Sequence, residues 1–327
     1  MNCHERQGYR ANSPWNVVTI PSVSTDGSRK AIIAAFVANL GIAIAKFVGF
    51  AVTGSASMLA EAVHSVADTS NQGLLLLGGR RAGRAATADH PFGYGRERYF
   101  WAFVVALVIF SLGALFALFE AEEKLRHPHP LESPNVAIVI LSMAIVFELL
   151  SLRTAVRESR PHKGSASWIT FIRRSKSPEL PVVLLEDIGA LFGLVFALAG
   201  VILADVTGND RFDAVGSLAI GILLAVIAVT LMIEMKSLLI GEAATPEREG
   251  TIRSVVEKRP EVQRIIHMKT QHLGPEELLV ALKVQLNPGL TVEEIADAIN
   301  ALETDVRSAV PVARVIYVEP DLHRATA

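Results

Sequence analysis

Four polar residues share one face of an apolar helical segment near the start of the chain. Glu61, His64, Asp68 and Asn71 are separated by three, four and three residues, the spacing that places side chains on the same side of an α-helix. The surrounding run has the length and apolar character of a membrane-spanning helix. Each charged residue at the centre of such a helix costs roughly 2.5 to 3.5 kcal/mol on insertion, whereas each Leu or Val contributes only about 0.3 to 0.6 kcal/mol. A bound divalent cation is the natural compensation for this cost.

These residue types are the ones that zinc prefers. Imidazole nitrogen and carboxylate oxygen bind zinc at about 2.0 to 2.2 Å, usually in tetrahedral geometry, so His64 and Asp68 can share one ion, with Glu61 one helical turn away. Two ligands on one helix require others from a facing helix. A later apolar segment contains the adjacent acids Glu186 and Asp187. Because neighbouring helix residues point about 100° apart, these two acids cannot both aim squarely at one ion, and either can instead pair with a buried base.

Other interpretations of the buried polar residues stay open. His64 can simply hydrogen-bond a neighbouring helix, although such contacts usually use Ser, Thr, Asn or Gln rather than two carboxylates. Glu148 and Asp213 are further acids in apolar segments. Asp213 falls near the start of a predicted helix, where a negative charge is favoured without any metal. We expect structural roles for these last two acids.

The elements that must position these residues are membrane spans. A helix needs about 20 residues to cross a bilayer. By this rule the apolar runs of the sequence contain six predicted spans. The connections after the second and fourth spans are rich in arginine and lysine, whereas the connection after the third is acidic. Because basic loops stay on the cytoplasmic side, we expect a multi-pass protein of the cell (inner) membrane with both termini in the cytoplasm. The predicted spans cover about residues 31–52, 56–79, 100–120, 135–156, 180–204 and 212–240.

The spans divide the chain into three predicted regions. Residues 1–30 are polar and form an N-terminal arm, residues 31–240 hold the six-helix all-α transmembrane bundle, and residues 241–327 have the mixed composition of a small cytoplasmic domain. The last region is predicted to be α+β, in the order αββαβ of a ferredoxin-like fold.

Local signals in the last region support that order. Thr245-Pro246 begins a helix, and Thr291-x-x-Glu294 is a capping box that begins another. Apolar and polar residues alternate from 277 to 286, which predicts a strand. Two further strands are predicted at 262–270 and 312–318.

Composition and motifs exclude several classes of function. A net charge of −2 gives no support to nucleic-acid binding. The single cysteine, Cys3, excludes a cysteine-rich zinc site and an intrachain disulfide. The His-Glu-x-x-His pattern of metalloproteases does not occur, so we expect no enzymatic activity. No resident cofactor is expected.

Several segments together resemble the cation diffusion facilitator family over about residues 30–320. The features are the spans, the His64-x-x-x-Asp68 pair, the acids of the fifth span, the αββαβ domain and the loop His90-Pro91-Phe92-Gly93-Tyr94-Gly95. Four segments are similar to the subgroup that contains the mitochondrial zinc transporter of animals. These are Thr53-Gly54-Ser55-Ala56-Ser57-Met58, Glu61-Ala62-Val63-His64-Ser65, Asp68-Thr69-Ser70-Asn71-Gln72-Gly73 and Val183-Leu184-Leu185-Glu186-Asp187.

The resemblance implies secondary active efflux of a divalent cation, foremost Zn²⁺, by metal/proton antiport. It also implies a homodimer formed through the C-terminal domain. Proton coupling fits the ligand chemistry, because metal binding requires a neutral imidazole and ionised carboxylates. Mn²⁺, Fe²⁺ and Co²⁺ are competing cargoes, and a non-transporting metal sensor on the same fold is the alternative function.

The resemblance also implies a ligand set with one gap. The family takes two ligands from the second span and two, spaced four apart, from the fifth. His64, Asp68 and Glu186 fill three positions, but the fourth falls on Ala190, which cannot bind metal. Asp187, Glu61 or water can complete the shell.

The family's C-terminal domain often binds additional metal, for which the available residues are His267, His272, His323, Glu319 and Asp321.

Overall fold

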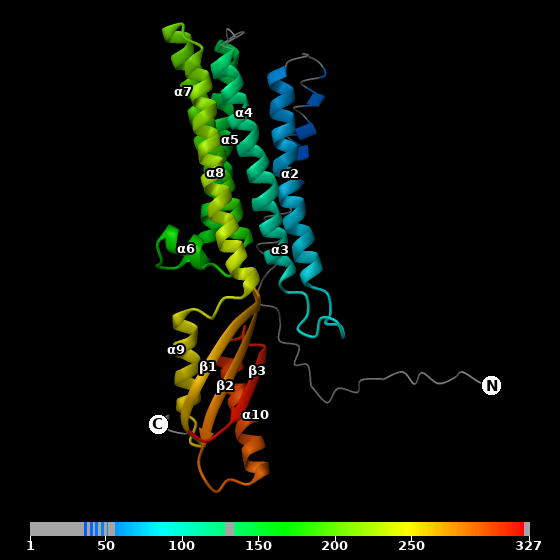
Figure 1. The fold of residues 1–327 in the computed structure, drawn as a ribbon, viewed down its shortest axis with the longest axis vertical. Coiled ribbons are helices and arrows are strands. Elements are labelled where there is room, and N and C mark those ends of the chain that lie inside the picture. Colours follow the sequence, from blue (N-terminus) through cyan, green and yellow to red (C-terminus); the bar gives the residue numbers. More distant parts are fainter. Residues whose placement is uncertain are drawn as a thin grey trace, which may run out of the picture.

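Long helices stand side by side above a small domain built from a sheet and two helices (Figure 1). The computed structural model describes residues 56–127 and 134–323, together with isolated positions between 36 and 51. At 56–65, 67–68, 109–110 and 136 it describes the backbone alone.

The long helices coincide with the apolar runs of the sequence, because a helix satisfies its own backbone hydrogen bonds and so tolerates a lipid environment. The helix that begins at Glu97 continues to Arg126 through a π-helical turn. The elements of this bundle are α2 (Ala56–Ala82), α3 (Glu97–Val104), η1 (Val105–Phe110), α4 (Ser111–Arg126), α5 (Pro134–Lys163), α7 (Glu179–Thr207) and α8 (Arg211–Ile240).

Among the described residues, four helical segments are long and apolar enough to cross a membrane: Glu97–Arg126, Ala137–Lys163, Glu179–Thr207 and Arg211–Ile240. They coincide with the last four predicted spans. Helix α2 forms where the second span was predicted but is not one of the four. The first predicted span, residues 31–52, and the N-terminal arm lie largely outside the described residues. The transmembrane helices are therefore confirmed, while the count of six stays a prediction.

The bundle packs through one apolar cluster and through close backbone contact. Leu75 of α2, Tyr99 of α3, Val182 of α7 and Leu231 of α8 are all buried in the same cluster. Farther along, a Cβ on Gly216 of α8 would lie only 2.9 Å from the carbonyl oxygen of Phe196 in α7. Glycine is therefore required there for the two backbones to approach each other.

One short helix of the bundle was not predicted. Helix α6 (Trp168–Arg174) lies in the connection between α5 and α7 and projects sideways from the base of the bundle (Figure 1). Ser167 caps it, since its Oγ accepts a hydrogen bond of 3.1 Å from the backbone N–H of Thr170. Phe171 is buried, and Arg173 pairs with Glu234 of α8 at 3.5 Å.

The small domain has the predicted αββαβ order: α9 (Pro246–Glu257), β1 (Val262–Gly274), β2 (Glu277–Leu286), α10 (Val292–Ala309) and β3 (Val315–Pro320). Strand β2 is central, antiparallel to β1 and parallel to β3. Its alternate residues Leu278, Val280, Leu282 and Val284 are buried in the domain core. The capping box of Thr291 and Glu294 is confirmed in both directions.

Three predicted strand ends were wrong, one in β1 and two in β3, which ends at Pro320 and not at 318. β1 continues to Gly274 because Gln271 and His272 go on pairing with β2. β3 begins at Val315 and not at 312, because residues 311–312 form a turn before it.

Candidate metal centre

Helix α2 carries the first half of the predicted site. Its backbone is helical from Ala56 to Ala82, so positions 61, 64 and 68 share a helix face with Asn71 and Leu75. The side chains of Glu61, His64 and Asp68 lie outside the described residues. Asn71 is 1% exposed and Leu75 is 3% exposed, and Leu75 belongs to the bundle's apolar cluster. The face of α2 that holds the predicted ligands therefore continues into the interior of the bundle.

Helix α7 carries the second half. Asp187 is buried, and Ser151 of α5 donates its hydroxyl toward both carboxylate oxygens, at 3.3 Å and 3.2 Å. Glu186 is half-buried and lies about 100° around the helix from Asp187. Helical periodicity places Glu186 on the same face as Val182 and Gly193, and Gly193 faces α8. The two neighbouring acids thus lie on different sides of α7. Asp187 faces α5, and Glu186 lies on the side toward the bundle interior.

The two halves lie at a similar depth in the bundle. Helix α2 ends, and α7 begins, at the end of the bundle that bears the small domain (Figure 1). Leu75 of α2 and Val182 of α7 belong to one buried cluster. Position 68 lies about 10 Å beyond Leu75, and position 186 about 6 Å beyond Val182, at a rise of about 1.5 Å per residue. Among the described residues α2 packs mainly on α3 and η1, and α7 on α5 and α8, so an ion shared by the two halves stays a prediction.

Position 190 supplies no metal ligand, as the sequence indicated. Ala190 lies one turn beyond Glu186 and offers only a methyl group. Among the side chains that the structure describes, no group of three His, Cys, Asp or Glu residues could hold a metal ion. The ligand set His64, Asp68, Glu186, Asp187 and Glu61 accordingly stays a prediction.

Sequence reasoning missed some polar partners in the bundle. Ser151 was not identified as the residue that holds Asp187, because a serine in an apolar helix carries no signal of its partner. Gln72 is buried beside Asn71, and within the described residues neither amide oxygen has a hydrogen-bond partner. Asp213, expected to be structural, lies 2.8 Å from Lys124 of α4. That ion pair joins α4 to α8.

The cytoplasmic-domain residues considered for additional metal are not gathered into a site. His272 is fully buried, its Nδ1 lies 3.2 Å from the carbonyl oxygen of Gly274, and burial lowers its pKa to about 4. Glu319 and Asp321 are paired with Lys283 at 3.0 Å and 2.9 Å. These groups are therefore engaged in contacts within the domain.

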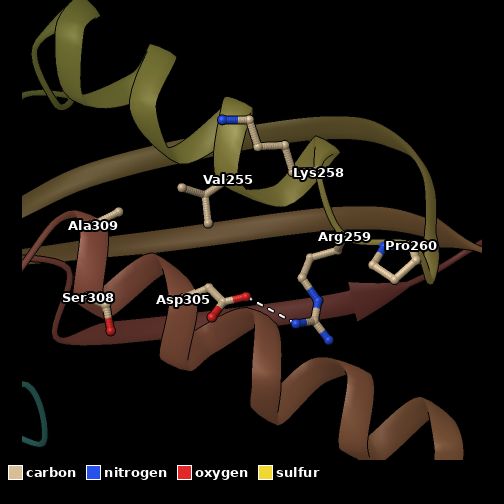
Figure 2. Close-up of a pocket in the computed structure, with 7 residues that line it drawn as sticks. All are labelled: Val255, Lys258, Arg259, Pro260, Asp305, Ser308 and Ala309. Carbon is tan, nitrogen blue, oxygen red and sulfur yellow. Dashed lines mark hydrogen bonds and ion pairs between the residues drawn. The ribbon is translucent and has the colours of Figure 1, made fainter.

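A shallow hollow of about 550 Å³ lies between the ends of α9 and α10 (Figure 2). The guanidinium of Arg259 crosses it to Asp305 of α10 at 3.1 Å and also pairs with Glu261. The Arg259 guanidinium that crosses the hollow is therefore already paired. The hollow is best explained as a helix–helix junction closed by an ion pair.

Charged side chains pair where the bundle meets the small domain. Arg98 of α3 donates to Glu179 of α7 and lies 3.7 Å from Glu276 in the turn between β1 and β2. Lys176, just before α7, pairs with Glu242, just after α8. The first group contacts the small domain directly, and the second ties the start of α7 to the connection that leads into that domain.

Comparison with known proteins gives the family. The cation efflux transmembrane domain matches residues 32–240, and the cytoplasmic domain of cation efflux proteins matches residues 244–321. The human mitochondrial "Proton-coupled zinc antiporter SLC30A9" is 34% identical over 256 residues, which cover 77% of this chain and 45% of that protein. "Metal tolerance protein C4" of Arabidopsis thaliana is 29% identical over 83% of this chain and 60% of its own length. "Zinc transporter ZitB" of Escherichia coli is 26% identical over 84% of this chain and 82% of its own length.

The chain thus spans about half the length of the curated relatives it matches first. The matched regions cover both the helical bundle and the αββαβ domain, and they include every position of the predicted metal centre. The chain belongs to the cation efflux family, whose members are multi-pass membrane transporters of metal ions.

Proposed function

We propose that this protein exports divalent cations, foremost Zn²⁺, across a membrane in exchange for protons. The observation that carries the proposal is that one buried cluster includes Leu75 of α2 and Val182 of α7, so that the polar face of α2 and Glu186 of α7 lie at a similar depth in the bundle. The names of two relatives, a proton-coupled zinc antiporter and a zinc transporter, support the choice of cargo.

The proposed site consists of His64, Asp68 and Glu186, with Glu61 or water to complete the shell and Asp187 in reserve. Metal binding requires these groups to lose their protons, and release of the metal allows them to be protonated again. Alternating exposure of the site to the two sides of the membrane then exchanges metal for protons. Imidazole favours zinc over manganese, while geometry sets the final selectivity.

We also propose that both termini and the αββαβ domain lie in the cytoplasm, with the chain divided at residues 1–30, 31–240 and 241–327. The last turns of α2 and α5 are basic, with Arg80, Arg81, Arg160 and Lys163, at the end of the bundle that bears the small domain (Figure 1). Basic helix ends stay on the cytoplasmic side. The match to a family of cytoplasmic domains named for dimerisation supports a homodimer formed through this domain.

The test is metal flux into proteoliposomes under an imposed pH gradient, with Zn²⁺, Mn²⁺, Fe²⁺ and Co²⁺ compared. His64→Ala, Asp68→Ala and Glu186→Gln should abolish zinc-driven proton movement. Asp205→Asn is the matched control, because Asp205 is an exposed acid on the same helix as Glu186. Normal flux in the three site variants would disprove the ligand set, and metal binding without flux in the unmodified protein would favour a metal sensor.

A further inference from the structure

Three arginines continue the exposed face of helix α5 at its end nearest the small domain. Arg153, Arg157 and Arg160 are separated by four and three residues, so they lie on one side of the helix. All three are exposed. None of them makes an ion pair or side-chain hydrogen bond with another residue in the described part of the chain. We call these three residues the arginine stripe.

The same face of α5 is apolar farther into the bundle. Val146 and Leu150, at the helical spacing that leads into the arginine stripe, are 57% and 54% exposed. The most apolar window of this helix has 0% of its residues buried. An apolar, unburied face on a membrane-spanning helix is a face for lipid chains. The arginine stripe therefore extends a lipid-facing surface along the same side of the helix.

The length of α5 places the stripe at the level of the lipid headgroups. The helix has 30 residues and is about 45 Å long, whereas the hydrocarbon core is about 30 Å thick. About 15 Å of the helix therefore lies beyond the hydrocarbon, and the basic last turn with Arg160 and Lys163 places that excess at the end that holds the arginine stripe, in the headgroup layer. Guanidinium groups in that layer meet phosphate oxygens, which they can bind with two parallel hydrogen bonds.

Helix α6 adds an interfacial element to this end of the bundle. It lies between two membrane-spanning helices and projects sideways at their base (Figure 1). Ile169 is 72% exposed, and Trp168 packs edge-on against Phe171 with the Lys163 ammonium 5.2 Å from the Trp168 ring centre. An exposed apolar residue, an aromatic ring and a basic last turn are typical of a helix that lies in the membrane interface.

We propose that the arginine stripe and α6 together bind the headgroup of an anionic phospholipid. A lipid is favoured over a soluble anion because the stripe continues directly from exposed apolar residues of α5, where acyl chains would lie. An acidic peptide would match the charges but would have no contact with Val146 and Leu150, whereas the acyl chains of a lipid would contact both. The inference depends on the membrane position of α5 and is independent of the transported metal.

The test uses the full-length protein, purified in detergent and delipidated. Binding of dioleoylphosphatidylglycerol and dioleoylphosphatidylcholine is titrated by native mass spectrometry. Each arginine near an anionic surface strengthens binding by roughly fivefold, so R153Q/R157Q/R160Q should weaken phosphatidylglycerol binding at least tenfold and leave phosphatidylcholine binding unchanged. The matched control is R253Q/K258Q/R264Q, which removes the same charge from exposed positions of the small domain and should bind like the unmodified protein. Equal binding by the stripe variant and the unmodified protein, or an equal loss in the control, would overturn the proposal.

Two further arms separate a lipid from other anions. Ile169→Asn keeps every charge and should still weaken phosphatidylglycerol binding severalfold, because α6 loses its apolar contact with the bilayer interface. Millimolar glycerol phosphate should not displace the lipid. Displacement by glycerol phosphate, or tighter binding of a polyglutamate peptide than of phosphatidylglycerol at the stripe, would show that the site is not a lipid site.

Discussion

Arg98, at the start of α3, lies 3.7 Å from Glu276 in the turn between β1 and β2. The same guanidinium donates its Nε–H to Glu179, the first residue of α7. One side chain of α3 therefore contacts both α7 and the small domain. Motion of α3 relative to α7 would therefore change the distance between Arg98 and Glu276 in the β1–β2 turn.

Removing this arginine should destabilise the protein strongly. Glu179 is only 4% exposed, so Arg98→Gln leaves a buried carboxylate without its partner, and we expect a loss of about 3 kcal/mol in the free energy of unfolding. Glu276→Gln should cost less than about 1 kcal/mol, because this partner is more exposed and farther away. Thermal unfolding of the two variants in detergent measures the difference. Equal losses would show that the contact with Glu179 does not dominate.

A glycine contact at the same junction gives an independent prediction. A Cβ on Gly95 would lie 2.8 Å from the carbonyl oxygen of Leu273 and 3.1 Å from Cα of Gly274. Gly95→Ala should therefore push the α2–α3 loop off the β1–β2 turn and cost about 1 to 3 kcal/mol. Gly250→Ala is the control, since Gly250 is exposed inside α9 with nothing within 4 Å, and this change should stabilise the protein by about 0.5 to 1 kcal/mol. Limited proteolysis of the loop would report the loosened contact, and an uncleaved Gly95→Ala loop would contradict it.

The sequence predicted the elements better than their contacts. Long apolar runs predicted the long helices, and the alternation of apolar and polar residues helped to predict the αββαβ order. Both signals depend only on the local spacing of apolar residues. Helix α6 was missed because it has only seven residues, too few to show a period. The partner of Asp187 was missed because Ser151 is 36 residues away, and packing of α5 on α7 depends on the whole bundle. Ala190 was recognised as a gap, but which group fills it depends on side-chain placement that spacing does not specify.

Acid should weaken the small domain through His272. Burial lowers the pKa of this imidazole to about 4, whereas in the unfolded chain it is about 6.5. The unfolded state therefore binds more protons between these values, so stability is complete above about pH 6.5 and falls as the pH drops toward 4, by up to about 3 kcal/mol. The measurement compares unfolding of the unmodified protein and His272→Asn between pH 4.5 and 7.5. Parallel pH profiles for the two proteins would show that His272 is not the group responsible.

The neighbouring acids of α7 should respond differently to loss of charge. Asp187 is held by Ser151 of α5, whereas Glu186 shares the helix face that leads to the bundle's apolar cluster with α2. We therefore expect Glu186→Gln to abolish zinc flux in proteoliposomes and Asp187→Asn to retain measurable flux. Ser151→Ala should cost about 1 kcal/mol of stability through the lost hydrogen bond and leave zinc affinity unchanged. If Asp187→Asn instead eliminated zinc binding as fully as Glu186→Gln, Asp187 would have to leave Ser151 and act as the fourth ligand. In that case Ser151→Ala should tighten zinc binding, because the carboxylate would no longer need to break its hydrogen bonds before reaching the metal.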